Sequence, residues 1–350
     1  MATGPVGLKV WEVLVAWGRI LAGRAPMLSI EITKECPLRC PGCYAYNDNH
    51  LGGAVALRSL SELRGEALVN AVLDLVRKHR PAHVSLVGGE PLLRVRELNE
   101  ILPRLSAMNV FSMVVTSAVA PIPAHWMQVP RFKVAVSVDG LPEHHDIRRR
   151  PATYERILKN IADRQVNIHL TITRPMLQSD GYLAEYFSFW NSRPEVARIW
   201  VSTYTPQKGE QSPEMLTRRD RSALFADMVN WRAAFPKVLI NPDIIAAFEA
   251  PPPNPGACVF AKMSVNYSAD MRTRVEPCIF GGEPDCATCG CASSIGLQSL
   301  RSVRLVGPLK AGHLLNSSIW IGSMVRALLG SHRPSRWRTP DPDLVQIATD

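Results

Sequence analysis

The sequence predicts an α/β fold in which parallel strands alternate with helices, because β-rich runs and segments of helical period follow one another along the first part of the chain. Six β-rich runs can be counted, which is fewer than the eight strands of a closed barrel. A proline-rich run then leads into a cysteine-rich segment. Together these three observations predict a partial (β/α)6 TIM barrel with a small cysteine-rich C-terminal extension.

The six predicted strands are short and rich in apolar and β-branched residues, as buried parallel strands usually are. They are Met27–Thr33, Ala82–Val87, Val110–Thr116, Lys133–Val138, Val166–Thr173 and Ala197–Thr203. Because the strands are expected to be parallel, the chemistry should lie at their carboxyl ends.

Two predicted helices carry sequence signals at their start. Residues 61–79 place apolar side chains on one stripe, and Ser59 followed by Glu62 predicts a cap in front of them. Residues 217–234 form the second helix, whose first residue, a threonine, is followed three positions later by Asp220. The same capping pattern therefore predicts both helix starts.

The chain divides into four predicted parts, and the run "APPPNPG" separates the barrel from the cysteine-rich region because it cannot continue a helix. The parts are an amphipathic helix in residues 1–26, the barrel in 27–249, the cysteine-rich region in 250–296, and an amphipathic helix with a basic tail in 297–350.

The chain is basic, with 40 Lys and Arg against 31 Asp and Glu, so an anionic partner is favoured. The basic residues are scattered and no recognition-helix or RNP-like pattern occurs, so we expect no nucleic-acid partner. The N-terminal apolar run is interrupted by Glu12 and Arg19 and falls short of the ~20 apolar residues that span a bilayer. No signal-peptide cleavage pattern follows it, so we expect a cytoplasmic protein.

Three cysteines, Cys36, Cys40 and Cys43, follow the first predicted strand in the run "CPLRCPGC". In a reducing compartment, clustered thiols are more often metal ligands or catalytic groups than disulfides. Iron–sulfur clusters are usually held by four thiolates, so three would leave one iron open to a ligand that is not protein. A zinc site that borrows a distant fourth ligand is the alternative.

The second predicted strand ends in "VGGEPLL". Gly88 and Gly89 allow a close backbone approach, Glu90 adds a carboxylate and Pro91 starts the next segment. A Gly-Gly pair after a strand is weak evidence alone, since any tight turn uses one. Coupled to the cysteine triplet on the preceding loop, it is a strong signal.

These paired motifs resemble those of the radical S-adenosylmethionine (radical SAM) enzymes over about residues 27–206. "CPLRCPGC" matches the family's Cys-x-x-x-Cys-x-x-Cys motif, and "GGEP" matches its second motif. The resemblance implies that Cys36, Cys40 and Cys43 are catalytic and hold a 4Fe-4S cluster whose open iron binds the amino and carboxylate groups of S-adenosylmethionine (SAM). It also implies that Glu90 and the backbone of this turn hold the SAM amino group.

The fourth strand resembles the peptide-modifying branch of the family, in which Ser-x-Asp-Gly ends the strand and His-Asp-x-x-Arg follows. By this resemblance, Ser137 and Asp139 lie within reach of the SAM ribose. Arg149 is expected to pair with the SAM carboxylate in a bidentate way. Tyr44, directly after the last cysteine, and Thr173, at the end of the fifth strand, are further cofactor-binding candidates.

Some neighbouring positions carry other expectations. Thr116 and Ser117 stand where relatives often carry Thr-Asn-Gly, which argues against a ribose contact there. A solvated basic turn is the alternative interpretation of Arg148–Arg150. His144 and His145 are expected at the surface or as supporting groups, not as bases.

Five further cysteines follow the proline-rich run, and they are Cys258, Cys278, Cys286, Cys289 and Cys291. The region resembles the SPASM or twitch extensions of radical SAM enzymes, which bind auxiliary iron–sulfur clusters. Thr273 replaces the family's turn glycine, and five cysteines are fewer than the seven of a full SPASM domain, so we predict one auxiliary cluster. A structural zinc site stays open as the alternative. A second "GGEP", at 281–284, is expected to be a turn without a SAM role.

The resemblance implies an enzyme in which reductive cleavage of SAM gives a 5'-deoxyadenosyl radical that abstracts hydrogen from carbon of a peptide or small metabolite. An electron donor such as flavodoxin or ferredoxin is implied as well. Two alternatives stay open. The basic amphipathic stretches 7–24 and 319–338 suggest a lipid substrate at a membrane surface, unless they pack against the barrel exterior. A non-catalytic zinc-binding module is the other alternative.

Overall fold

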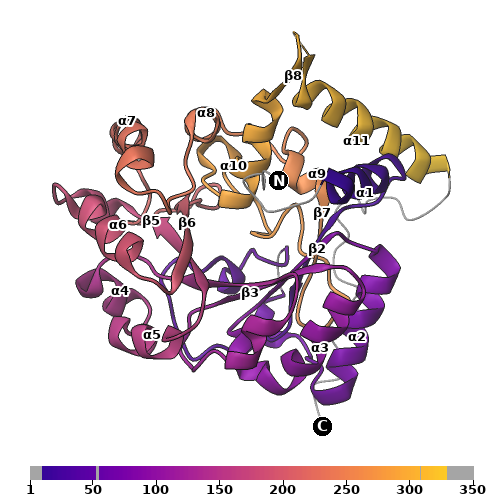
Figure 1. Ribbon diagram of the computed structural model, residues 1–350, viewed down its shortest axis with the longest axis horizontal. Coiled ribbons are helices and arrows are strands. Elements are labelled where there is room, and N and C mark those ends of the chain that lie inside the picture. The colour runs from indigo at the N-terminus through magenta and orange to yellow at the C-terminus, as the bar shows by residue number, and fades with distance from the viewer. Residues whose placement is uncertain (1–9, 53–54, 308, 329–350) are drawn as a thin grey trace.

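The structure is a computed structural model of the 350-residue chain, and it describes residues 10–52, 55–307 and 309–328 (Figure 1). Its centre is a seven-stranded parallel sheet in the order β6-β5-β4-β3-β2-β1-β7. The strands are β1 (Met27–Glu31), β2 (His83–Val87), β3 (Phe111–Thr116), β4 (Phe132–Ser137), β5 (Val166–Ile172), β6 (Val196–Thr203) and β7 (Ser264–Tyr267). The first six confirm the predicted strands to within two residues at either end.

The sheet is not closed, since β6 and β7 are its two edges, and this open arrangement of parallel strands confirms the predicted partial barrel. β7 was not predicted. It pairs in parallel with β1, from Met27 beside Ser264 to Ile30 beside Tyr267. The cysteine-rich extension therefore enters the barrel's own sheet before it reaches most of its cysteines.

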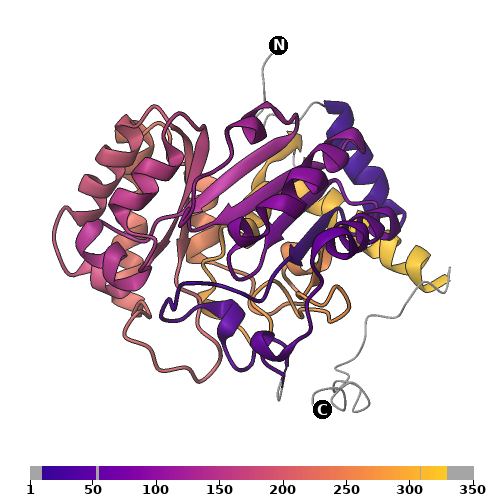
Figure 2. The same ribbon diagram turned by 90° about the horizontal axis from the view of Figure 1, so that it is seen from below.

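Helices surround the sheet on both sides. In Figure 1, α2 to α6 lie below and to the left of the sheet, and α8 to α11 lie above it (Figures 1 and 2). The helices are α1 (Val10–Leu21), α2 (Gly65–His79), α3 (Val95–Ala107), α4 (Pro142–Arg148), α5 (Tyr154–Ile161), α6 (Tyr182–Ser192), α7 (Arg218–Ala234), α8 (Pro242–Glu249), α9 (Val259–Met263), α10 (Ala292–Ser299) and α11 (Ala311–Leu328). A short hairpin of β8 (Arg304–Val306) and β9 (Leu309–Lys310) precedes α11.

Short 3-10 helices occupy several of the connections. They are η1 (Tyr44–Tyr46), η2 (Leu57–Ser59), η3 (Pro91–Arg94), η4 (Ala124–Gln128), η5 (Arg174–Leu177), η6 (Cys286–Thr288) and η7 (Leu300–Ser302). The main core lies between the strands and the helices that cover them, and its largest fully buried side chains include Trp126, Trp190, Tyr186 and Phe187.

One of the two predicted helix starts is confirmed. Thr217 caps α7, and Asp220 closes a capping box with it. The cap predicted for α2 is wrong, because this helix begins at Gly65. Ser59 ends a separate 3-10 turn and donates its hydroxyl within that turn, while Glu62 binds the cysteine loop, as shown below.

The two terminal helices, α1 and α11, lie side by side beyond β7 (Figures 1 and 2). The indole Nε1 of Trp17 donates to Ser318 Oγ at 2.9 Å across their contact. These helices agree with the amphipathic segments expected at both ends, whereas the predicted basic tail lies mostly outside the described residues. Among the helices described, none combines the length and apolar character needed to cross a bilayer.

Candidate active site

The predicted site residues gather at the carboxyl edge of the sheet, since each follows a parallel strand at its C-terminal end. The cysteine loop follows β1, the GGEP turn follows β2, and Asp139 and Thr173 follow β4 and β5. Ser137 is the last residue of β4, and both it and Thr173 are buried. Parallel topology thus brings Cys36 and Thr173 to the same edge of the sheet, although they are 137 positions apart in the sequence.

The three cysteines of the first loop are free thiols of intermediate exposure. Burial, together with the negative charges nearby, raises the pKa of Cys36 to about 11 and also raises that of Cys43, so both thiols are neutral near pH 7. Such thiols ionise when a metal binds, because metal coordination releases the proton. The donor set therefore fits a thiolate-ligated iron–sulfur cluster.

The cysteine loop turns sharply between its second and third cysteines at Gly42, which has a φ of +59°. A Cβ at this position would lie 2.3 Å from the hydroxyl of Tyr204, so only glycine fits between the loop and that ring. Tyr204 follows β6 and was not singled out from the sequence. Its tyrosine ring has no motif to mark it, because the contact depends on how the loops that follow β1 and β6 approach each other.

The GGEP turn presses directly against the base of the cysteine loop. A Cβ on Gly88 would lie 2.6 Å from the Thr33 carbonyl, and one on Gly89 would lie 2.0 Å from that of Glu35. The backbone N–H of Gly89 donates to Thr33 O and that of Glu90 donates to Glu35 O, both at 2.8 Å. The two glycines are therefore required by the contact between the two loops.

Glu90 is buried and binds the end of the third strand. Its Oε1 accepts from Thr116 Oγ1 at 2.5 Å and from Leu92 N at 2.9 Å, and its Oε2 accepts from Ser117 N at 2.8 Å and Ser117 Oγ at 2.5 Å. These four bonds occupy the acceptor positions of a carboxylate. In this structure Glu90 therefore ties β2 to β3, and Pro91 follows it as the first residue of η3.

Asp139 is the centre of a buried ionic cluster. Its Oδ2 accepts from Arg149 Nε at 2.6 Å and from Arg148 Nε at 3.0 Å, and its Oδ1 accepts from Thr171 N at 3.1 Å. Burial disfavours the carboxylate, but the two guanidinium groups outweigh it and hold the pKa of Asp139 far below its usual range. The charged form of Asp139 is thus secured at neutral pH.

The basic run after α4 is only partly a solvated turn. Arg150 is exposed, but Arg148 and Arg149 are largely buried, so the alternative interpretation is wrong for these two. Arg148 also donates to Pro41 O at 2.9 Å and pairs with Glu214. Burial opposes the charge of Arg149, but Asp139 outweighs it and raises the pKa of Arg149. The cluster therefore reaches from β4 to the cysteine loop.

Of the two histidines before this run, His145 supports the cluster, as expected. His145 is buried, and its Nδ1 accepts from the backbone N–H of Asp139 at 3.0 Å while Nε2 donates to Ala152 O at 2.8 Å. Burial and the nearby Arg149 lower the pKa of His145 to about 4, which keeps it neutral. His144 packs edge-on against Tyr182.

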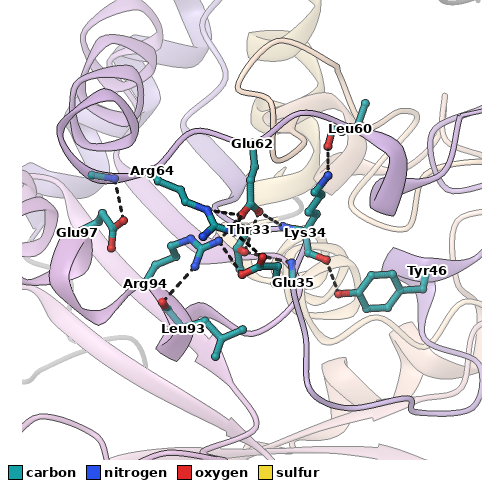
Figure 3. A network of polar contacts seen from close by, with 11 residues as sticks. Thr33, Lys34, Glu35, Tyr46, Leu60, Glu62, Arg64, Leu93, Arg94 and Glu97 are labelled. Carbon is teal, nitrogen blue, oxygen red and sulfur yellow. Dashed lines mark hydrogen bonds and ion pairs between the residues drawn. The ribbon is translucent and has the colours of Figure 1, made fainter. Parts of the chain in front are cut away.

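A second polar network fixes the residues that precede Cys36 (Figure 3). Glu62 accepts from Lys34 N at 2.9 Å and from Thr33 Oγ1 at 3.0 Å, and it pairs with Arg94. Arg94, the last residue of η3, also pairs with Glu35 at 3.0 Å. This network joins the start of the cysteine loop to the segment that follows GGEP, so the two motifs are held as one unit.

The five cysteines of the extension line one cavity, together with largely apolar residues. Burial raises the pKa of Cys286 to about 11 and that of Cys291 to about 12 and also raises those of Cys278 and Cys289, so these thiols are neutral near pH 7 and would ionise on metal binding. Within the described ranges, no three Cys, His, Asp or Glu side chains converge on a point that one metal ion could occupy. The cavity therefore brings the five predicted ligand thiols of the extension together.

The second GGEP, at 281–284, is a tight turn, as expected. Gly281 and Gly282 both have positive φ, and a Cβ on either would collide with the backbone of Asn49 and His50. The side chain of Gln207 accepts from Glu283 N at 2.7 Å. This turn packs the extension against the end of the cysteine loop.

A buried pair links the two cysteine groups. His50 Nε2 lies 2.7 Å from Glu31 Oε1, and His50 Nδ1 lies 2.9 Å from Phe280 O. The other Glu31 oxygen accepts from Ser268 Oγ at 2.6 Å. Tyr44 packs beside this pair, with its ring against those of His50 and Phe280, so the structure places it toward the extension; a contact with SAM stays a prediction.

His50→Ala is expected to destabilise the fold by about 3 kcal/mol, because it leaves the Glu31 carboxylate buried without its basic partner. Burial opposes the His50 charge, but Glu31 outweighs it and raises the pKa of His50. This stabilisation is complete below the unfolded-state pKa of about 6.5 and is lost as pH rises through the folded-state pKa. Urea unfolding across pH 6 to 9 checks this, with the exposed His125→Ala as the control. A variant as stable as the parent at pH 6 would contradict it.

A model of the Radical SAM superfamily matches residues 30–178, from β1 through η5. The chain is 32% identical over 97 residues to the PqqA peptide cyclase of Xanthomonas campestris pv. campestris, which is 27% of this chain and 23% of that protein. It is 30% identical over 110 residues to the 7-carboxy-7-deazaguanine synthase of Hyperthermus butylicus, or 31% of this chain and 41% of that one. The match thus spans less than half the length of either relative.

Two solved structures share the fold. Native anSMEcpe with bound AdoMet aligns with a TM-score of 0.54 at 14% identity, over 73% of this chain and 74% of that one. Streptococcus suis SuiB bound to precursor peptide SuiA aligns with a TM-score of 0.51 at 16% identity, over 96% of this chain and 72% of that one. The motif geometry and the family match together confirm the resemblance, and residues 30–178 of the chain are a domain of the radical SAM superfamily.

Proposed function

We propose that this protein is a radical SAM enzyme that cleaves SAM reductively and takes a hydrogen atom from a carbon of a peptide substrate. One observation carries the proposal: the loop after β1, which carries three free cysteines, is hydrogen-bonded at its start to the GGEP turn after β2, inside the region that matches the family. A peptide is favoured because PqqA peptide cyclase is a relative and SuiB binds a precursor peptide. A small metabolite is the alternative, supported by the deazaguanine synthase relative.

The chain's own residues divide the work of holding the cofactors. Cys36, Cys40 and Cys43 would hold a 4Fe-4S cluster, and the GGEP backbone would face the amino group of SAM. Asp139 orients Arg149, whose guanidinium is the group on this edge best suited to a carboxylate of SAM. When bound, cluster and SAM together supply the 5'-deoxyadenosyl radical.

Abstraction of a hydrogen atom needs no general base, and three groups that could serve as one are already engaged. The carboxylates of Glu90 and Asp139 are engaged by neighbouring donors, and His145 is neutral and hydrogen-bonded at both nitrogens. The protein's task is then to orient the cofactor and to exclude competing reactions.

We further propose one auxiliary iron–sulfur cluster on four of the five extension cysteines, with an electron donor such as flavodoxin or ferredoxin and a cytoplasmic location. The single cavity lined by all five thiols supports one cluster and not two. Nothing at this site favours a lipid as the substrate.

The test is anaerobic reconstitution with iron and sulfide, followed by dithionite and SAM, with 5'-deoxyadenosine measured by chromatography. Production of 5'-deoxyadenosine by the parent is the expected result, and iron content with and without the five tail cysteines counts the second cluster. No 5'-deoxyadenosine from a protein with a full complement of iron would refute the proposed activity.

Arg221 is the cation that the structure places beside the proposed auxiliary cluster. From α7, it donates to Thr288 O at 2.9 Å, to Phe248 O at 3.0 Å and to Thr203 Oγ1 at 3.3 Å. Among the described residues, no carboxylate lies within ion-pair distance of it, and burial lowers its pKa against the opposing effects of Cys289 and Asp285. A partly buried cation without a carboxylate is stabilised by an anion, which a thiolate-ligated cluster supplies.

Arg221→Gln is therefore expected to lower the midpoint potential of the auxiliary cluster by about 60 mV, a tenfold change in its one-electron equilibrium. Removing a nearby positive charge disfavours the more negative, reduced cluster. Arg221→Lys should keep most of the parent potential, and Arg219→Gln, exposed on the same helix, is the matched control. An EPR-monitored redox titration measures this. Equal potentials in parent and Arg221→Gln would refute the electrostatic role.

A further inference from the structure

The outer side of α11 is apolar although it faces solvent. Leu314, Ile321 and Leu328 follow one another at seven-residue spacing and are 41, 41 and 83% exposed. Trp320 and Met324 add to the same outer side and are 63 and 46% exposed. Isolated exposed apolar residues are common, but a continuous stripe along one helix marks an interaction surface.

This stripe is not a result of loose packing. The adjoining side of α11, with Leu315 and Ser318, is buried against the rest of the protein. A Cβ on Gly322 would lie 2.0 Å from Ile20 O, so α11 and α1 are in close backbone contact. α1 repeats the pattern, since Leu14 is 66% exposed and Leu21, seven residues later, is 36% exposed. The pair therefore presents apolar side chains after its own packing is complete.

The sequence that carries the two helices is strongly basic. From residue 286 to 340 the sequence contains no Asp or Glu but seven Arg and Lys, and residues 1–30 contain one Glu against three Arg and Lys. Of the basic residues described, Arg24, Arg304 and Lys310 are exposed. Apolar side chains with a basic surround are what an anionic bilayer surface attracts. A second copy of the chain would place like charges against each other.

We propose that the α1–α11 pair docks the protein onto the surface of an anionic lipid bilayer, with its apolar side chains in the interface and its basic residues at the headgroups. The pair lies beside β7, which is an edge strand of the sheet (Figure 1). This docking surface is independent of the cysteine sites and of the proposed reaction.

The experiment is co-flotation of the full-length protein with vesicles of phosphatidylcholine containing about one third phosphatidylglycerol, at low and high salt. The parent should float with these vesicles at low salt and much less at high salt or with pure phosphatidylcholine. Ile321→Ser combined with Leu328→Ser should lower the partition coefficient by about a hundredfold. The control is Met108→Ser combined with Val229→Ser, which changes two exposed apolar residues elsewhere and should float like the parent.

Tryptophan fluorescence tests whether α11 itself contacts the lipid. Quenching of tryptophan fluorescence by brominated lipid should fall in Trp320→Phe, which keeps flotation because the side chain stays apolar. No flotation of the parent with anionic vesicles, or equal flotation of parent and the Ile321/Leu328 double variant, would overturn the proposal. A lipid-free dimer that the same double variant dissociates would also overturn it, since the stripe would then bind a second copy.

Discussion

Changing Cys36, Cys40 and Cys43 together to alanine is expected to lower 5'-deoxyadenosine formation by more than about a hundredfold. Changing a residue that only supports a metal ligand lowers metal affinity or activity by about 10–100-fold, and here the ligands themselves are removed. The three thiols sit on one loop with intermediate exposure, so their loss removes the redox centre without opening the barrel core.

The extension supplies an internal control for this triple variant. Its five cysteines lie in a separate cavity, so the variant should keep the auxiliary iron and lose the rest. Retained auxiliary iron would show that the fold and the reconstitution are intact. A triple variant as active as the parent would mean that these cysteines do not hold the catalytic cluster.

The second large effect is expected from Asp139→Asn, which should destabilise the fold by about 3–5 kcal/mol. The change leaves the guanidinium groups of Arg148 and Arg149 buried without the carboxylate that both bind. SAM binding should weaken as well, because Arg149 would lose the partner that orients it. Urea denaturation and calorimetric titration with SAM measure the two effects.

The pH dependence of this effect follows from the lowered pKa of Asp139. A group whose folded-state pKa is depressed stabilises the fold above its unfolded-state pKa of about 3.9, and that contribution is lost as pH falls toward the folded-state value. The stability difference between parent and Asp139→Asn should thus be constant from pH 5 to 7 and shrink below about pH 4. Asp180→Asn, at an exposed position, should show no difference. A difference that grows on acidification would contradict this account.

The first six strands were predictable because each is a short apolar run, and this pattern is visible in the strand's own residues. The cap of α7 was predictable for a similar reason, since Thr217 and Asp220 interact within one turn. β7 was missed because its four residues lie inside the cysteine-rich segment and have no strand pattern of their own. They form a strand by pairing with β1, where Met27 lies beside Ser264, 237 positions later in the sequence.

The site was predictable as a set of motifs but not as a set of contacts. The sequence pattern predicted that Glu62 caps a helix, but its carboxylate binds Lys34 and Arg94. No local pattern reveals these two contacts. The sequence comparison argued against a ribose contact at Thr116 and Ser117, and the structure shows that both side chains donate hydrogen bonds to Glu90. Such roles depend on which strand ends meet at the sheet edge, and that is a property of the tertiary fold.

The proposed reaction depends on an iron–sulfur cluster at the first cysteine loop, with one iron that no protein ligand occupies. Its most direct test is the low-temperature EPR spectrum of the reduced, oxygen-protected protein before and after SAM is added. We predict a 4Fe-4S signal whose g values change when SAM binds, and whose SAM-sensitive part disappears in the triple cysteine variant. Tightly bound zinc at Cys36, Cys40 and Cys43, with no iron–sulfur signal, would contradict the account.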